Sequence, residues 1–242
     1  MITRQLYRLA LAHPNSRVIV QNTTDKATLQ SMTQLKDEQL VLIRGSGADL
    51  NHYQYLPEPP APPIVVTMAA RLLRDKGVRE FVSAARLAKA QGRDDIIWQL
   101  AGSPDPGNPA SISEQELAQW QREIRYLGEV EDIAELYSQS HIVTLPSYRE
   151  GLPKSLVEAA ACGRAVVTTD VPGCRDAIES GVTGFLVEVC DAEALYEAVL
   201  KLADDEELRQ SMGRAGHQLA LEEFDEKLIA NKQVALYQAL LA

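Results

Sequence analysis

Short apolar runs alternate with longer amphipathic segments along most of the chain. The apolar runs, which predict β-strands, are residues 17–21, 40–43, 64–69, 96–101, 124–127, 142–145, 165–169 and 185–187. Several of them, such as IVVTMA at 64–69, are apolar and β-branched at successive positions rather than at every second position. This pattern is typical of strands that are buried on both faces.

Segments with helical periodicity lie between these runs. Residues 78–91, 153–162, 191–203 and 225–241 place apolar side chains three or four positions apart. Alternating strands and helices predict parallel strands that are joined by right-handed crossovers. The expected fold class is therefore α/β, a Rossmann-like doubly wound parallel sheet with helices on both faces.

A proline-rich segment at residues 56–63 divides the chain, because it holds five of the 12 prolines. Such a segment is extended and cannot lie inside a helix or a central strand. The preceding residues contain only two predicted strands, too few for a core of their own. We therefore predict a tail of a missing amino-terminal domain plus linker at 1–56, the main α/β domain at 57–222, and a carboxy-terminal helix at 223–242.

The net charge of −10 excludes some partners. An acidic protein repels phosphate backbones, which argues against nucleic acid as the partner. Residues 1–24 are an exception, with three arginines and no acid. This basic segment would suit an anionic membrane surface, but a buried interface with another domain explains its leucines equally well.

The apolar runs and the cysteine content predict a cytoplasmic protein. A peripheral position on the inner face of the cell membrane is the alternative. No apolar run is long enough to span a bilayer, and the start of the chain lacks the apolar stretch of a signal peptide. Three scattered cysteines suit a reducing compartment. The four histidines have no ligand spacing and there is no Asp-x-Asp pair, so we expect no metal site.

Candidate chemistry follows two of the predicted strands. After the strand at 64–69, Arg71, Arg74 and Lys76 precede Gly77 and a helix. Cations in a strand-to-helix loop suit a phosphate group, although a solvated basic turn would have the same composition. In an open α/β sheet, ligands bind beyond the carboxyl ends of the strands, where this loop would lie.

The second loop follows the strand at 142–145 and carries Glu150. Pro153 suits the first position of the next helix, so the N–H groups of residues 154–156 (Lys154, Ser155, Leu156) would form an anion site. Glu158 lies about 7–8 Å further along the helix axis and leans back toward the same end. Two carboxylates around an anion site suit a ligand with a sugar on each side of a diphosphate. An exposed helix glutamate is the alternative for Glu158, and its apolar neighbours argue against it.

These motifs resemble the carboxy-terminal domain of family 4 glycosyltransferases with the GT-B fold. The resemblance rests on PSYREGLPKSLVEAAACG at 146–163, AVVTTDVPG at 165–173, the basic loop at 70–77, LGEV at 127–130 and GVTGFLV at 181–187. The two glutamates separated by seven residues are the family hallmark. Within the family, the sequence looks most like bacterial enzymes that build O-antigen, capsule or related surface polysaccharides.

The resemblance implies a role for each site residue in a retaining, metal-independent transferase. Arg71 and Lys76 would neutralise the diphosphate of a UDP-sugar or a similar donor. Glu150 would bind hydroxyls of the donor sugar, Glu158 would bind the ribose hydroxyls, and the Val130 backbone would meet the base. No cofactor is implied beyond the nucleotide-sugar donor itself. The acceptor, a glycan or a polyprenyl-linked lipid, would bind through the missing amino-terminal domain.

Two departures from the family pattern leave other interpretations open. Pro153 stands where many relatives have glycine, and only the tail of the acceptor-binding domain is recognisable. The chain could therefore be a non-catalytic donor-binding module or one subunit of a split transferase. A sugar-nucleotide epimerase of similar fold is a third interpretation, but it would lack this spacing of carboxylates.

Overall fold

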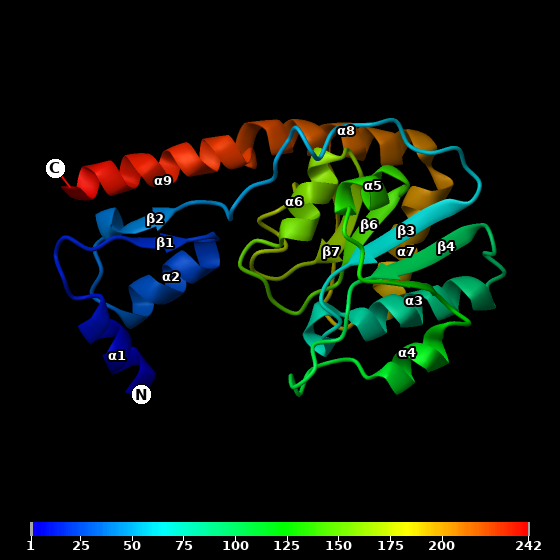
Figure 1. Ribbon diagram of the computed structural model, residues 1–242, viewed down its shortest axis with the longest axis horizontal. Helices are drawn as coiled ribbons and strands as arrows, with labels where there is room; N and C mark the ends of the chain where they lie inside the picture. The colour runs from blue at the N-terminus through cyan, green and yellow to red at the C-terminus, as the bar shows by residue number, and fades with distance from the viewer. Residues whose placement is uncertain (1, 242) are drawn as a thin grey trace.

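The computed structural model describes residues 2–241 and contains a central six-stranded parallel sheet (Figure 1). The strand order is β5-β4-β3-β6-β7-β8, and all five neighbouring pairs are parallel. The strands are β3 (Ile64–Ala69), β4 (Ile96–Ala101), β5 (Arg125–Gly128), β6 (Ile142–Leu145), β7 (Ala165–Thr169) and β8 (Gly184–Val187). The predicted doubly wound sheet is confirmed, and every predicted strand is present within one residue of its expected bounds.

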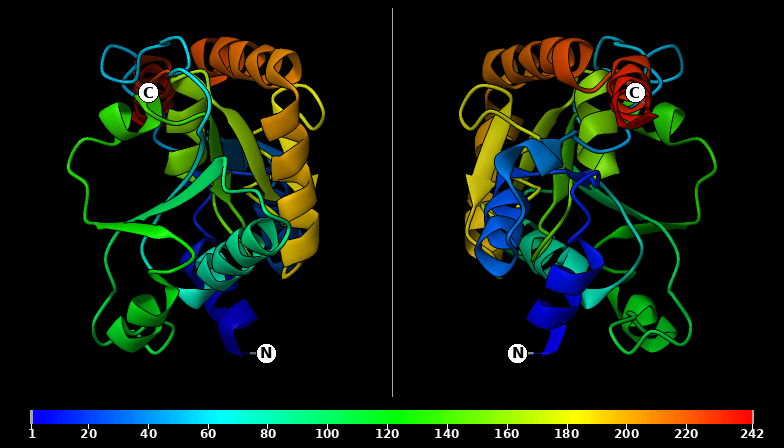
Figure 2. Two further views of the ribbon diagram at one scale, coloured as in Figure 1. Left: turned by 90° about the vertical axis from the view of Figure 1, so that its right-hand side faces the viewer. Right: turned by 90° about the vertical axis from the view of Figure 1, so that its left-hand side faces the viewer.

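Helices cover both faces of this sheet (Figure 2). They are α3 (Val78–Ala90), α4 (Glu114–Trp120), α5 (Ile133–Ser138), α6 (Lys154–Ala161), α7 (Ala192–Asp204) and α8 (Glu206–Glu223), with a 3-10 turn at Arg74–Lys76. Helix α3 packs beside α7, and α6 packs beside α8. The apolar core between the layers includes Phe81, Trp98, Leu145 and Leu156, none of them more than 3% exposed.

The amino-terminal part forms a small second unit around a two-stranded parallel sheet (Figure 1). Its elements are α1 (Ile2–Ala10), β1 (Val18–Val20), α2 (Thr23–Met32), a 3-10 turn (Asp37–Gln39) and β2 (Leu40–Leu42). Helix α9 (Glu226–Leu241) leaves the main domain and runs back along this unit. The Asn15 side chain donates a hydrogen bond to the Leu240 carbonyl at 3.2 Å, which joins the two parts.

Five of the helices were not predicted, and their sequences show why. Helix α2 buries none of its residues, so it has no apolar face to detect. Helix α8 buries Arg209, Gly213 and Gly216 on the face where leucines would be expected. A Cβ at Gly213 would clash with the carbonyl of Gly163, so glycine is required there by close packing against the main domain. The remaining three, α1, α4 and α5, have nine residues or fewer.

The sheet order places a topological switch point between β3 and β6. The chain leaves β3 toward β4 on one side of the sheet and leaves β6 toward β7 on the other. Such a reversal opens a crevice beyond the carboxyl ends of the two strands, where ligands of open α/β sheets bind. Both loops that carry the candidate chemistry follow these two strands.

Among residues 2–241, the helices include none with the length and hydrophobicity of a transmembrane segment.

The three cysteines differ in exposure, and we expect their reactivity to differ in the same order. Burial raises the pKa of Cys162 to about 12 and that of Cys174 to about 11, whereas Cys190 is exposed. Since the thiolate is the nucleophile, both buried thiols stay protonated at pH 8. An aromatic disulfide reagent should modify one thiol rapidly in the native protein and three after denaturation. Rapid native modification of a second cysteine would contradict this order.

Candidate functional site

Two adjoining cavities open at the carboxyl ends of the central strands. The larger has a volume of about 510 Å³ and the smaller about 210 Å³. Ala69, Ala70 and Arg71 at the end of β3 and Ser155 on α6 line both of them. The two cavities therefore form one cleft across the switch point between β3 and β6.

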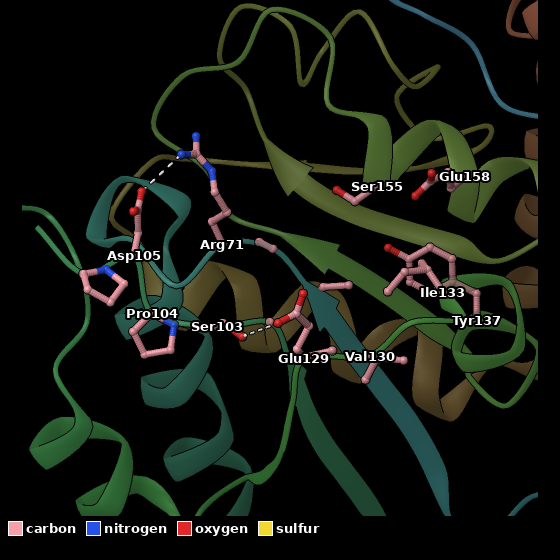
Figure 3. Close-up of a pocket in the computed structure, with 15 residues that line it drawn as sticks. Arg71, Ser103, Pro104, Asp105, Glu129, Val130, Ile133, Tyr137, Ser155 and Glu158 are labelled. Atoms are coloured by element: carbon pink, nitrogen blue, oxygen red, sulfur yellow. Dashed lines mark hydrogen bonds and ion pairs between the residues drawn. The ribbon is translucent and has the colours of Figure 1, made fainter. Parts of the chain in front are cut away.

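The larger cavity is lined by small residues at the strand ends and by polar side chains at its rim (Figure 3). Ala101 ends β4 and Gly102 follows it, and the cavity wall continues through Val130 to α5. A Cβ at Gly102 would clash with the Ala70 carbonyl, so glycine allows the two strand ends to approach each other. On the rim, the Ser103 hydroxyl donates a hydrogen bond to Glu129 at 3.4 Å. At about 510 Å³, the cavity is large enough for a small organic ligand.

The smaller cavity is built around an ion pair between Lys76 and Glu150. The Lys76 Nζ lies 2.5 Å from the Glu150 Oε1, and the two side chains are 19% and 12% exposed. The Ser147 hydroxyl donates to the same carboxylate oxygen at 2.6 Å. The structure thus brings together two residues that the sequence places 74 positions apart. A cation and a carboxylate that are both aimed at one pocket can bind a phosphate and a hydroxyl side by side.

The loops that carry Lys76 and Glu150 are packed directly against each other. The backbone N–H of Tyr148 donates to the Asp75 carbonyl at 2.8 Å, and the N–H of Glu150 donates to the Pro172 carbonyl at 3.1 Å. Gly77 adopts a left-handed conformation with φ of 76°, and a Cβ there would clash with the Pro146 carbonyl. Glycine is therefore required at this tight turn into α3. These contacts fix the positions of both charged side chains before any ligand binds.

Glu158 is a buried carboxylate in the wall of the larger cavity. Its side chain is 8% exposed, and its Oε1 lies 3.4 Å from the Lys154 Nζ at the mouth of the cleft. The alternative of an exposed helix glutamate is therefore wrong. Burial of a carboxylate is unfavourable unless cations or hydrogen-bond donors lie nearby. It is available to accept hydrogen bonds from ligand hydroxyls.

The amino-terminal end of α6 differs from the predicted arrangement. Pro153 is the cap residue that precedes the helix, and Lys154 is the first helical residue. The N–H of Leu156 donates to the Pro153 carbonyl at 3.1 Å, so it is not available to an anion as expected. The physical reason is a tight first turn, in which a bond across three residues satisfies one of the otherwise free N–H groups. The N–H groups of Lys154 and Ser155 remain candidates for anion binding.

Arg71 lines both cavities, but its guanidinium points toward the loop after β4 (Figure 3). Its Nη1 lies 3.3 Å from the Asp105 Oδ2, and the side chain is 67% exposed. An exposed ion pair of this kind contributes little to stability. The guanidinium can therefore turn into the cleft at a small energetic cost. No group of three or more metal-ligating side chains occurs among residues 2–241.

Two tyrosines near Glu158 were not identified from the sequence. Burial is the main cause that raises the pKa of both Tyr53 and Tyr137, and the Glu158 carboxylate raises both further. Tyr137 lies on the short unpredicted helix α5, and Tyr53 precedes the proline-rich segment. Neither has a local sequence signal, because only the folded chain brings these rings to α6.

Comparison with known proteins shows clear similarity over most of the chain. Residues 56–219 match the model of the family described as glycosyl transferases group 1. An N,N'-diacetylbacillosaminyl-diphospho-undecaprenol alpha-1,3-N-acetylgalactosaminyltransferase of Campylobacter jejuni is 37% identical over 177 residues, which cover 73% of this chain and 45% of that protein. The capsular polysaccharide biosynthesis glycosyltransferase CapM of Staphylococcus aureus is 27% identical, with 73% and 46% covered. The chain thus spans less than half the length of these two relatives.

Solved structures share the fold of nearly the whole chain. HepE of Anabaena in complex with UDP superposes with a TM-score of 0.83 at 22% identity, over 98% of this chain and 68% of HepE. Sucrose-phosphate synthase of Thermosynechococcus elongatus gives 0.85 at 23% identity, with 99% and 62% covered. Both the main domain and the amino-terminal unit are included in these superpositions.

Proposed function

This chain belongs to the glycosyl transferases group 1 family, and we propose that it is the donor-binding half of a retaining glycosyltransferase. The reaction would transfer a sugar from a UDP-sugar to a glycan or a polyprenyl-linked acceptor in bacterial surface-polysaccharide synthesis. The observation that carries this proposal is the arrangement of Lys76, Glu150 and Glu158 around the start of α6. They lie in one cleft at the switch point of a parallel sheet.

Each part of the cleft has a role in this proposal. Lys76 and Arg71 bind the diphosphate and stabilise the negative charge that it gains as the glycosidic bond breaks. Glu150 accepts hydrogen bonds from the donor sugar. Glu158 accepts hydrogen bonds from the ribose, and the base lies in the larger cavity near Val130. The cations take the place of a metal ion, and retention of configuration rests on the resemblance to family 4.

The named relatives support the choice of donor and acceptor. HepE was solved with UDP, and the Campylobacter enzyme is named for transfer to an undecaprenol-linked saccharide. An undecaprenol-linked acceptor would bring the complete protein to a membrane surface. Peripheral contact with the inner face of the cell membrane is part of the same proposal.

Calorimetry with UDP tests the donor site. We expect the 242-residue chain to bind UDP in buffer that contains a chelator, because the proposed charge neutralisation uses side chains and no metal. Glu158→Gln should weaken binding by about tenfold or more, the effect of losing a hydrogen bond to a charged group. Strict dependence on added Mg²⁺ or Mn²⁺ would contradict the roles given to Arg71 and Lys76.

Transfer activity is the test that separates an enzyme from a binding module. Glycosyl transfer requires the acceptor hydroxyl to be held at the anomeric carbon with water excluded. The cleft residues come from the main domain alone, so we expect UDP binding but negligible transfer to a polyprenyl diphosphate-linked acceptor by this chain alone. Robust turnover that Glu150→Ala abolishes would show instead that the chain holds the acceptor itself.

A further inference from the structure

The Tyr137 hydroxyl is a buried polar group without a hydrogen-bond partner among residues 2–241. Tyr137 is 0% exposed and forms part of the wall of the larger cavity. Figure 3 shows its side chain extending from α5 toward the cavity, on the side where Glu158 and Ser155 lie. A buried hydroxyl without a partner is unfavourable, and native proteins satisfy nearly all such groups. This exception therefore needs an explanation.

Glu158, on the neighbouring helix α6, has a carboxylate that can accept a further hydrogen bond. Its buried carboxylate is paired with Lys154, a residue whose side chain is 64% exposed, at a separation of 3.4 Å. Lys154 also lines the smaller cavity, which holds Lys76 and is the proposed site of the diphosphate. A phosphate in that cavity would compete with Glu158 for the Lys154 ammonium group. Glu158 would then lose its cationic partner and keep the Tyr53 hydroxyl, whose hydrogen bond with Glu158 contributes to the raised pKa of Tyr53. A carboxylate has two oxygens and accepts several hydrogen bonds, so a second phenolic donor can take the place that Lys154 leaves.

We propose that Tyr137 is a positioning residue for Glu158, and that its phenol donates a hydrogen bond to this carboxylate when a nucleotide is bound. The inference rests on the proposed function, since it assumes that Glu158 binds the ribose. The phosphate attracts Lys154, and the Tyr137 proton replaces Lys154 as a partner of the carboxylate. One carboxylate oxygen is then fixed by Tyr137, and the other is directed at the ribose hydroxyls.

The chemistry of the phenol suits this role. Burial, and then the Glu158 carboxylate, raise the pKa of Tyr137 well above its ordinary value. The hydroxyl therefore keeps its proton throughout the physiological range and faces a carboxylate, which only accepts, as a neutral donor. A neutral donor orients a carboxylate without removing its charge, so Glu158 still accepts hydrogen bonds from a diol.

The test uses Tyr137→Phe, which removes only the hydroxyl, and Tyr196→Phe as the matched control. Tyr196 is equally buried at 3% exposed, but its hydroxyl contacts the Gln91 side chain at 3.1 Å, and it lines neither cavity. The melting temperature without ligand and the affinities for UDP and inorganic diphosphate are measured for each. Glu158→Gln and the Tyr137→Phe/Glu158→Gln pair complete a double-mutant cycle.

Tyr137→Phe should leave the ligand-free melting temperature unchanged or higher, because it removes a hydroxyl that has no partner. Its affinity for UDP should fall about five- to tenfold, the effect of one lost hydrogen bond to a charged group, while its affinity for inorganic diphosphate stays the same. In the Glu158→Gln background, the same substitution should change UDP affinity less than twofold. Tyr196→Phe should leave both affinities unchanged.

Other results would overturn the inference in distinguishable ways. Unchanged UDP affinity in Tyr137→Phe, or a full loss that persists in the Glu158→Gln background, would show that Tyr137 does not act through Glu158. A lower melting temperature with parallel losses for both ligands would make Tyr137 a purely structural residue. Failure of the unsubstituted chain to bind UDP at all would refute the proposed function and this inference together.

Discussion

The Arg71→Gln/Lys76→Gln variant is expected to bind UDP about 100- to 1,000-fold more weakly than the unsubstituted chain. A hydrogen bond to a charged group contributes about 1.5–3 kcal/mol, so two such contacts near the lower end of this range contribute about 3–4 kcal/mol to the binding of one diphosphate. Lys76 lies in a largely buried pocket where little water screens it, whereas Arg71 is exposed. Lys76→Gln alone should therefore account for the larger part of the loss in UDP affinity. Titration calorimetry at low ionic strength measures the UDP affinity of the single and double variants.

Arg79 and Arg86 supply a matched control for this experiment. Both are exposed arginines on α3, paired with Glu116 and Glu123, and neither lines the cleft. The Arg79→Gln/Arg86→Gln variant removes the same total charge and should bind UDP within about twofold of the unsubstituted chain, because exposed charges are screened by salt. If both double variants lose affinity equally, the effect comes from the overall charge and not from the cleft.

The main domain was predictable because its central strands are almost entirely buried. Runs such as 64–69 and 165–169 are apolar or β-branched at every position, and the amphipathic segments between them match α3, α6 and α7. The predictions failed where burial is achieved without large apolar side chains. Helix α8 packs through glycines and a buried arginine, and α5 is only six residues long. For α4, the Ser113–Glu116 capping box was a local signal that could have identified the start of the helix.

The sequence predicted which loops form the candidate site, but not how their side chains are arranged. The rule that ligands bind beyond the carboxyl ends of strands selected the loops of Lys76 and Glu150, and the structure places both in one cavity. The pairing of these two side chains, and the turn of Arg71 toward Asp105, depend on side-chain geometry that has no sequence signature. The same holds for Tyr137, which reaches the cavity from a separate helix.

The proline-rich linker is held by buried guanidinium groups, a feature that its sequence did not reveal. Arg209 on α8 donates to both carboxylate oxygens of Glu58 at 3.0–3.2 Å and to the Leu202 carbonyl at 2.8 Å. The two side chains are 2% and 8% exposed. Arg164, also buried, donates to the Leu56 carbonyl at 2.7 Å. The segment that connects the amino-terminal unit to the main domain is therefore fixed along its course rather than free to move.

Arg209→Met should accordingly lower the free energy of unfolding by about 3–5 kcal/mol, because it leaves the Glu58 carboxylate buried without its cation. For a chain of this size, a change of that magnitude corresponds to a fall in melting temperature of about 6–20 °C. Glu58→Gln/Arg209→Met should recover part of the loss, since no uncompensated charge remains. Arg93→Met is the control, because the ion pairs of Arg93 with Asp95 and Asp204 lie at the surface. The free energy of unfolding of this variant should be within about 1 kcal/mol of that of the unsubstituted chain. Equal losses for Arg209→Met and Arg93→Met in denaturant titrations would show that the buried pair does not hold the linker to α8.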